Sequence, residues 1–541
     1  GTDLEEQLAE IWKEVLNRDR VGVTDDFFEL GGDSIKAIQI STRLYKLGYK
    51  LEIKDLFLHP TVYSLSRVMK KAVVEAVSDQ SAVKGTVLLT PIQQLFFAAG
   101  HAEPQHYNQS VLLSSAERYQ IKGIRLVMKK LQEHHDALRM SYHIESGSVR
   151  QMNNGLSYPV HVGEYDLRES ADVLQEMENL ANELQQHMSL ETGPVMRTGI
   201  FRLPDGDRLL IVIHHLVVDG ISWRILFEDI GTLYRQYQDG EELELPSKTD
   251  SFRLWSERLH EYAEGERFLK ERSYWEAQER IPVERLREDH PVSSNRTGDA
   301  GVVSLVLEES ATAHLLSRVN QAYGTEINDI LLTGLGLAVA QSFGNKSLLI
   351  GMEGHGREGV LPGIDVNRTV GWFTSVYPVI LDMSYKEDLS RQIREVKETL
   401  QRIPNKGIGY GILKYLTSPE KRGGLQFSLT PEISFNYLGE FDADLQEAKL
   451  ELSSDSQGSA LSAGAERGYN IDITGMISSK RLILSVSYNR HQYEEATING
   501  FRDNYRDSIL RIITHCVSRK ETELTPSDLT YKHLSIQDLE R

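Results

Sequence analysis

The adjacent histidines His214 and His215 are the first candidates for chemistry, because imidazole can take or give a proton near neutral pH. They end an aliphatic and β-branched run, residues 209–213, that is typical of a buried strand. Asp219 and Gly220 supply a turn signal a few residues later, and a helical pattern follows. Neighbouring side chains on a strand point to opposite faces, so one histidine should pack inward while the other faces a cavity. On this segment alone, a buried, hydrogen-bonded pair is at least as well supported as catalysis.

Glu353 is the second candidate. It ends a strand-like run, residues 348–352, and leads the glycine-rich stretch Glu353-Gly354-His355-Gly356-Arg357-Glu358, so its carboxylate can enter a cleft. An apolar wall would raise the pKa of this carboxyl toward neutrality. The alternative is an ordinary solvated loop acid. Arg357 could bind phosphate or pair with a carboxylate, but bracing the loop is its default role.

Ser34 is the third candidate. The segment Gly31-Gly32-Asp33-Ser34 opens a helix that we expect to run to about Leu47, with Asp33 or Ser34 as its N-cap. By propensity alone, Ser34 is a capping hydroxyl. The two glycines, however, clear space for a partner's active site to approach that hydroxyl.

Composition limits what the whole chain can be. With 541 residues and 40% apolar content, it should form three or four compact units. A formal charge of −19 argues against nucleic acid as the main partner, and no apolar run approaches a membrane span. The single cysteine, Cys516, excludes an internal disulfide framework and fits a reducing, cytoplasmic compartment. The first residues carry no signal-like segment, so we expect a cytosolic piece of a longer protein.

The pattern of elements predicts two different kinds of domain. Helices expected over residues 2–17, 34–47 and 61–77, with a short turn at 54–58, make a four-helix domain at residues 1–77. Residues 78–86 form a short polar linker that we expect to act as a hinge. Beyond it, strand-like runs alternate with long helices, which predicts α/β construction. The strand-like runs are residues 110–113, 209–213, 301–307, 347–352 and 482–488.

The α/β part is too long for one core, so we expect two lobes, residues 87–280 and 281–525. The charged helical region near residues 251–280 should run into the crossover between them. A short segment, residues 526–541, follows; without further information it is a frayed end.

The segment Phe28-Glu29-Leu30-Gly31-Gly32-Asp33-Ser34-Ile35-Lys36-Ala37 resembles the phosphopantetheine attachment motif of peptidyl carrier proteins of nonribosomal peptide synthetases. The resemblance covers residues 1–77. It implies that Ser34 carries a covalent 4′-phosphopantetheine, a flexible arm ending in a thiol that holds an acyl group at high effective concentration.

Residues 214–220 match the His-His-x-x-x-Asp-Gly motif of the condensation-domain and chloramphenicol acetyltransferase superfamily, which implies a two-lobed α/β fold. Further segments resemble motifs of epimerization domains, and residues 353–358 are the most telling because condensation domains do not ordinarily carry them. The other segments are residues 90–97, 328–332, 368–374, 407–411 and 435–439. The chain as a whole is similar to the carrier–epimerization didomains of phenylalanine-racemizing initiation modules.

This resemblance implies a cofactor-independent isomerase, an epimerase that converts an L-aminoacyl thioester, with phenylalanyl as the acyl group, to an L/D mixture. The chemistry needs a positioned base, a group that returns the proton to the other face, and stabilisation of the enolate oxygen. His215 and Glu353 are the expected acid/base pair, and which of them removes the proton stays open. Tyr437 is implied as a proton donor or enolate-stabilising hydroxyl.

Supporting roles go to four residues. His214 is expected to be structural, Asn436 to contribute an amide, Arg357 to brace its loop, and Asp219 to hold the histidine loop through an ion pair. We find no context for pyridoxal phosphate, a dinucleotide fold or zinc, so phosphopantetheine is the only cofactor expected and no metal is.

The implied partners are an upstream adenylation domain, a phosphopantetheinyl transferase and a downstream condensation domain. The resemblance makes residues 526–541 a communication segment that docks on that condensation domain as a helix. Neither nucleic acid nor a membrane is expected. Two alternatives remain: a peptide-bond-forming condensation domain, in which His215 assists an attacking amine, and a non-catalytic recruitment platform.

Overall fold

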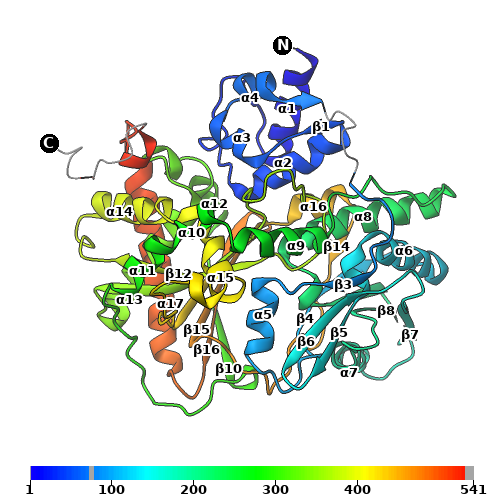
Figure 1. Cartoon of the computed structure of the whole chain (residues 1–541). Coiled ribbons are helices and arrows are strands. Elements are labelled where there is room, and N and C mark those ends of the chain that lie inside the picture. The colour runs from blue at the N-terminus through cyan, green and yellow to red at the C-terminus, as the bar shows by residue number, and fades with distance from the viewer. Residues whose placement is uncertain (1, 72–77, 530–535, 537–541) are drawn as a thin grey trace.

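The computed structural model describes residues 2–71, 78–529 and 536. It shows a small helical domain seated above the junction between two α/β lobes (Figure 1). The small domain is built from α1 (Asp3–Val15), α2 (Ser34–Lys46), α3 (Ile53–Leu58) and α4 (Val62–Val68). Trp12 and Phe27 are fully buried at its centre, with ring centroids 5.2 Å apart.

The last helix of the small domain is shorter than the sequence pattern predicts. It was expected over residues 61–77 but ends at Val68, where the backbone of Met69 becomes extended. Strand β2 (Lys70–Lys71) then pairs with β1 (Tyr49–Lys50), so strand pairing replaces further helical hydrogen bonds. The rest of the expected helix, residues 72–77, lies outside the described residues.

The first lobe is built on a five-stranded sheet in the order β14-β4-β9-β8-β7, with a three-stranded sheet β3-β6-β5 beside it. Its strands are β3 (Gly85–Val87), β4 (Asn108–Ser115), β5 (Met140–Glu145), β6 (Ser148–Asn153), β7 (His161–Asp166), β8 (Met196–Leu203) and β9 (Gly206–His214). Its helices are α5 (Pro91–Ala98), α6 (Ile121–His134), α7 (Val173–Gln186) and α8 (Gly220–Asp239).

The second lobe is built on a six-stranded sheet in the order β10-β16-β15-β13-β11-β12. Its strands are β10 (Ala300–Val306), β11 (Ser347–Gly354), β12 (Ser375–Asp382), β13 (Ile433–Glu440), β15 (Ile471–Ser478) and β16 (Arg481–Asn489). Its helices are α12 (Glu309–Leu315), α13 (Ile327–Phe343), α14 (Leu389–Gln401), α15 (Ile408–Tyr415), α16 (Asp442–Glu447) and α17 (Glu495–Val517). Each of the five strand-like runs found in the sequence coincides with an observed strand to within a few residues.

The lobes are joined in both directions. The expected helical crossover contains α9 (Phe252–Ala263), α10 (Glu266–Leu269) and α11 (Arg272–Glu279). Strand β14 (Glu451–Leu452) pairs with β4 and so belongs to the sheet of the first lobe. It lies outside the range expected for that lobe, residues 87–280. The expected hinge, residues 78–86, also lies against the first lobe: Gln80 hydrogen-bonds Lys248, and Gly85 begins β3.

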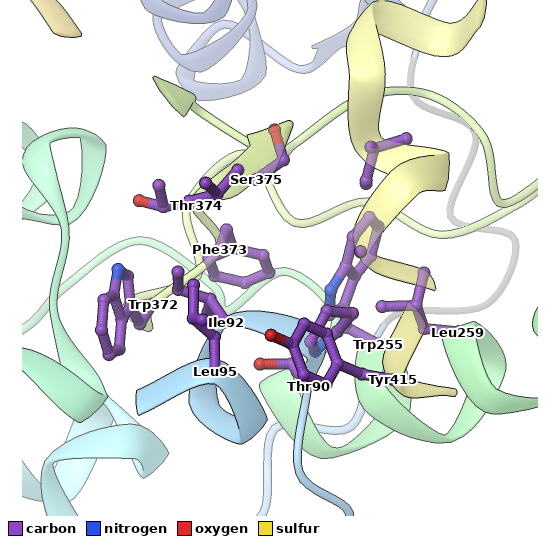
Figure 2. Close-up of a pocket in the computed structure, with 14 residues that line it drawn as sticks. Thr90, Ile92, Leu95, Trp255, Leu259, Trp372, Phe373, Thr374, Ser375 and Tyr415 are labelled. Carbon is purple, nitrogen blue, oxygen red and sulfur yellow. The ribbon is translucent and has the colours of Figure 1, made fainter. Parts of the chain in front are cut away.

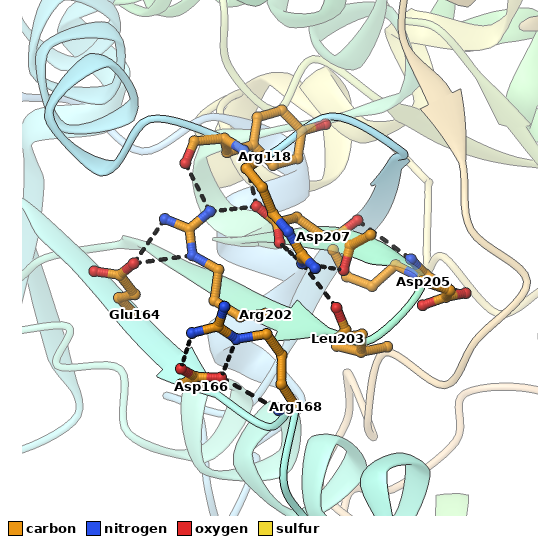
Figure 3. Close-up of polar contacts among 11 residues, drawn as sticks. Arg118, Glu164, Asp166, Arg168, Arg202, Leu203, Asp205 and Asp207 are labelled. Atoms are coloured by element: carbon orange, nitrogen blue, oxygen red, sulfur yellow. Dashed lines mark hydrogen bonds and ion pairs between the residues drawn. The ribbon is translucent and has the colours of Figure 1, made fainter.

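A buried carboxylate fixes the turn that leads into β9 (Figure 3). Asp207 is fully buried and pairs with the guanidinium groups of Arg118 and Arg202. Arg202 also binds Glu164 of β7 at 2.6 Å, and the backbone N–H of Tyr119 donates to Asp207 at 2.8 Å. A buried charge is tolerated where it is paired and hydrogen-bonded in this way. The network therefore anchors the strand that ends in His214.

No helix in the described part of the chain is both long enough and apolar enough to cross a bilayer.

Candidate active site

A cleft lies where the small domain meets both lobes. It encloses about 750 Å³, part of which is open to solvent. Its lining residues are Asp33, Ser34, Ile35, Asp219, Gly220, Ile221, Arg224, Glu326, Ile327, Asn328, Glu353, Gly354, His355, Thr374, Asn436, Tyr437 and Leu438. The cleft thus brings together five residues singled out in the sequence: Ser34, Asp219, Glu353, Asn436 and Tyr437.

Ser34 is the first residue of α2, and Asp33 before it is the N-cap. The Asp33 carboxylate accepts from the Lys36 N–H at 2.8 Å, so the capping role belongs to Asp33. Within the described residues, the Ser34 hydroxyl makes no hydrogen bond. Gly31 explains how this end of the helix approaches the second lobe: its φ is +90°, and an added Cβ would lie 2.0 Å from the Leu316 carbonyl oxygen. An unengaged hydroxyl at the mouth of a cleft fits a covalently attached arm.

Helix α2 is held in this position by polar contacts with the second lobe. The Gln39 amide donates to Asp444 at 3.1 Å, and Arg43 pairs with Glu447 at 2.8 Å. Asn367 donates to the Ser41 hydroxyl at 2.8 Å. These contacts set the direction in which Ser34 faces the cleft.

Both ring nitrogens of His214 face backbone groups. Its side chain is completely buried, with Nε2 2.7 Å from the Pro104 carbonyl oxygen. Its Nδ1 accepts from the Leu216 N–H at 3.1 Å, so the ring is neutral with its proton on Nε2. Burial lowers the pKa of His214 to about 3.

His215 occupies a different environment, at the turn after β9. Its Nδ1 is 2.8 Å from the Val218 carbonyl oxygen and its Nε2 is 3.2 Å from the side-chain nitrogen of Gln109. Its ring stacks on Trp372 with centroids 4.1 Å apart. Burial lowers the pKa of His215. His215 does not line the cleft described above but lies behind it, between Trp372 and Tyr107.

The hydrogen bonds around Gln109 define the tautomer of His215. The Trp223 indole N–H, which can only donate, donates to Gln109 Oε1 at 3.0 Å. The Gln109 NH₂ group must then face His215 and donate to Nε2. The ring is therefore neutral, with its proton on Nδ1 donated to Val218, and its Nε2 lone pair is occupied by Gln109.

Glu353 is placed in the cleft by the pairing of two strands that are distant in sequence. Strands β11 and β13 run parallel, with Met352 opposite Phe435, so Glu353 and Asn436 are neighbours. Asn436 Nδ2 donates to Glu353 Oε2 at 2.8 Å. Burial, reinforced by the negative charge of Asp472 and opposed by the Asn436 hydrogen bond, raises the pKa of Glu353 to about 7. Both protonation states of this carboxyl are thus accessible near neutrality.

Tyr437 follows Asn436 and borders both the cleft and the small domain. Burial raises the pKa of its hydroxyl well above the ordinary value, so the group stays a donor. The chain turns directly afterwards, where Arg224 donates to the Leu438 carbonyl at 2.7 Å and Gly439 has a φ of +77°.

Arg357 and Asp219 connect the glycine-rich loop to the histidine loop. Arg357 is buried and donates to the Val366 and Thr369 carbonyl oxygens at 2.7 Å each. It also forms an ion pair with Asp219 at 3.3 Å. The other carboxylate oxygen of Asp219 accepts from the Phe373 N–H at 2.9 Å. Of the three roles considered for Arg357, the structure shows bracing and carboxylate pairing together.

Sequence reasoning missed Gln109 and Asp472. Asp472 is a charged residue between Ile471 and Ile473 in β15, and that contrast was an available signal. Gln109 lies in β4, five of whose eight residues are polar, so nothing in the pattern distinguished it. The indole N–H of Trp223 orients Gln109.

Comparison with known proteins adds the family. Residues 83–535 match the condensation domain family, and residues 6–69 match the phosphopantetheine attachment site. The chain belongs to the condensation-domain family. The expected fold, a small helical carrier followed by a two-lobed condensation-superfamily domain, is confirmed, and the carrier domain is one that holds covalent 4′-phosphopantetheine.

A solved relative narrows the kind of condensation-type domain. The crystal structure of the epimerization domain from the third module of tyrocidine synthetase B is 42% identical, covers 83% of this chain and all of that chain, and superposes with a TM-score of 0.80. The expected resemblance to carrier–epimerization didomains of nonribosomal peptide synthetases is therefore confirmed.

Two longer relatives, both from Brevibacillus parabrevis, match this chain from end to end. Tyrocidine synthase 2 is 44% identical over all of this chain, which spans 15% of that protein. Tyrocidine synthase 1 is 42% identical over all of this chain, which spans half of that protein.

Proposed function

We propose that this chain epimerizes an L-aminoacyl group, held as a thioester through phosphopantetheine on Ser34, to a mixture of L and D forms. The observation that carries the proposal is that Ser34 lines the same cleft as Glu353 and Tyr437. An arm attached at Ser34 enters a cleft that contains a carboxyl group with a pKa of about 7. The prosthetic group supplies a thiol, and the thioester formed with it makes the Cα proton of the acyl group more acidic.

Glu353 is the group we assign to proton transfer at Cα within the cleft. Ionised, it takes the proton; protonated, it returns one. Asn436 donates to one carboxylate oxygen, and we assign the other to the proton of the substrate. The Tyr437 hydroxyl donates to the thioester oxygen, where negative charge develops.

His215 is proposed as the second proton-transfer group, acting from the side of Trp372. Its neutral ring has a lone pair on Nε2, but Gln109 must move aside before that lone pair can accept a proton from substrate. We therefore assign proton removal to Glu353 ahead of His215. His214, Asp219 and Arg357 maintain the geometry of the two loops.

A condensation-type function is the second candidate, because the matched family carries that name and His215 belongs to its motif. Peptide-bond formation gives no role to a buried carboxyl whose pKa lies near neutrality, and the 42% identical solved relative is an epimerization domain. A non-catalytic platform gives no role to Glu353, Asn436 and Tyr437 in one cleft with Ser34.

The surrounding pathway is proposed with the reaction. Phenylalanyl is the acyl group that the family resemblance implies. An adenylation domain would supply it, a phosphopantetheinyl transferase would modify Ser34, and a downstream condensation domain would accept the D form. We propose that these reactions take place in the cytoplasm.

The test uses the whole chain with Ser34 loaded with an L-aminoacyl phosphopantetheine. In deuterated water, the parent should incorporate α-deuterium and release a D/L mixture after thioester hydrolysis. S34A should prevent loading. If the fully loaded chain released only the L acid without deuterium, the proposal would be wrong. If it formed a new amide bond with an added amine, the result would favour condensation.

A further inference from the structure

Three of the sequence motifs meet at a second cavity (Figure 2). These are residues 90–97, 368–374 and 407–411. The cavity encloses about 450 Å³, part of it open to solvent. Its walls come from α5, α9, α15 and the segment that leads into β12, so it is assembled from parts of both lobes and their crossover.

The second cavity adjoins the reaction site. Thr374 lines both cavities. Two residues earlier, Trp372 lines the second cavity and stacks on His215 at 4.1 Å. Thr374 and Trp372 therefore place the second cavity next to the site where the acyl group would react.

The chemistry of the walls is apolar. Figure 2 shows Ile92 and Leu95 on one side of the cavity and Trp255, Leu259 and Tyr415 on the other, with Phe373 above and between them. None of the described lining side chains carries a charge. The lining also contributes the hydroxyls of Thr90, Thr374, Ser375 and Tyr415. A charged group placed here would lose its hydration without gaining an opposite charge, whereas an aromatic or branched aliphatic group would be buried against rings.

We propose that this cavity binds a neutral apolar group of the thioester-bound acyl chain. This inference rests on the proposed function and deepens it, because it assigns a specificity site to the same reaction. The group belongs either to the residue whose Cα is inverted or to the residue that precedes it in a peptidyl chain. Both sources present the same chemistry to the cavity, and loaded acyl groups can separate them.

The experiment measures α-deuterium exchange on the holo chain. The loaded acyl groups are alanyl, phenylalanyl, lysyl, tryptophanyl, alanyl-phenylalanyl and phenylalanyl-alanyl. In the two dipeptidyl groups, the residue named last is joined to the thioester. In the parent, we expect phenylalanyl to exchange at least about tenfold faster than lysyl. L95W narrows the cavity and L259A widens it. L174W, at an exposed position on α7, is the matched control.

The acyl groups whose exchange rate falls in L95W identify which residue of the acyl chain occupies the cavity. If the inverted residue occupies the cavity, L95W lowers the phenylalanyl and alanyl-phenylalanyl rates relative to alanyl by at least about tenfold. If the preceding residue does, the same loss falls on phenylalanyl-alanyl. L259A should shift the relative rates toward tryptophanyl, and L174W should keep the parent ratios.

Two outcomes overturn the inference in distinguishable ways. Relative rates that match the parent in both L95W and L259A exclude the cavity as a specificity site while leaving epimerization intact. Absence of exchange in the loaded parent with every acyl group overturns the proposed function, and the inference falls with it.

Discussion

The side-chain amide of Gln109 lies 3.2 Å from Nε2 of His215 and is oriented by the indole of Trp223. Protonation of His215 would place two donors against each other unless the amide turned and gave up its bond to Trp223. Q109L removes this obstacle but keeps the burial that lowers the pKa of His215, so that pKa should rise only part of the way toward its ordinary value. Q109E offers acceptors to both neighbours and should raise that pKa further. Titration of the ring by NMR measures the shift, and identical curves in parent and both variants would contradict it.

Glu353 gives the second prediction, which concerns rate. Because the pKa of Glu353 is about 7, the rate of α-hydrogen exchange should change across a limb near pH 7. E353Q should remove this limb and slow exchange by about 10²- to 10⁴-fold. Rates measured from pH 5.5 to pH 8.5 on the loaded chain provide the check. A variant that kept the parent profile would exclude Glu353 from proton transfer.

The same carboxyl predicts that the stability of the chain depends on pH. In the unfolded chain Glu353 should ionise near about pH 4.3, so between that pH and about 7 the folded state binds more protons. The free energy of unfolding therefore falls as pH rises through this window, by roughly 4 kcal/mol at most. E353Q lacks this loss, and its Tm relative to the parent should increase from pH 5 to pH 8. A difference in Tm that stays constant with pH would refute this account.

The sequence predicts where His214 and Glu353 lie along the chain, but it does not predict the hydrogen-bond partners around Glu353 and His215. Local patterns were sufficient to end a strand at His214 and another beside Glu353, because alternation and turn residues are local signals. The Asn436 bond to Glu353 depends on the parallel pairing of β11 with β13, some 80 residues apart, which periodicity does not encode. The same limit hid Gln109, whose role requires Trp223 and His215 to meet it in space. Strand β14, too short to carry a periodic signal, was missed for that reason.

The ion pair between Arg43 and Glu447 predicts an electrostatic contribution to carrier docking. The two side chains are 17% and 51% exposed, so the pair is partly screened by solvent. R43E should slow exchange on the tethered acyl group by about two- to fivefold at low salt, and less at high salt. Arg43 also pairs with Glu14 inside the small domain, so R43E alone does not isolate docking. Recovery in R43E/E447R, with E14Q as the control variant, would assign the effect to the interface.

The end of the chain gives the last prediction, and the structure moves its boundary. The docking segment was expected over residues 526–541, of which 530–535 and 537–541 lie outside the described residues. Its first residues belong to the catalytic domain, because Asp528 pairs at 2.7 Å with Lys397, whose side chain is 2% exposed. Deleting residues 526–541 leaves that ammonium group buried without its carboxylate. The cost should be on the order of 3 kcal/mol, and D528N in the full chain should reproduce most of it.

Deleting only residues 530–541 avoids this loss and isolates the docking role. The shorter deletion should keep the parent Tm and the parent rate of α-deuterium exchange. Transfer of the D-aminoacyl group to a separate condensation domain should fall, because the family resemblance implies that these residues bind the partner, and the deletion removes that binding. Transfer at the parent rate after this deletion would show that residues 530–541 do not recruit the partner.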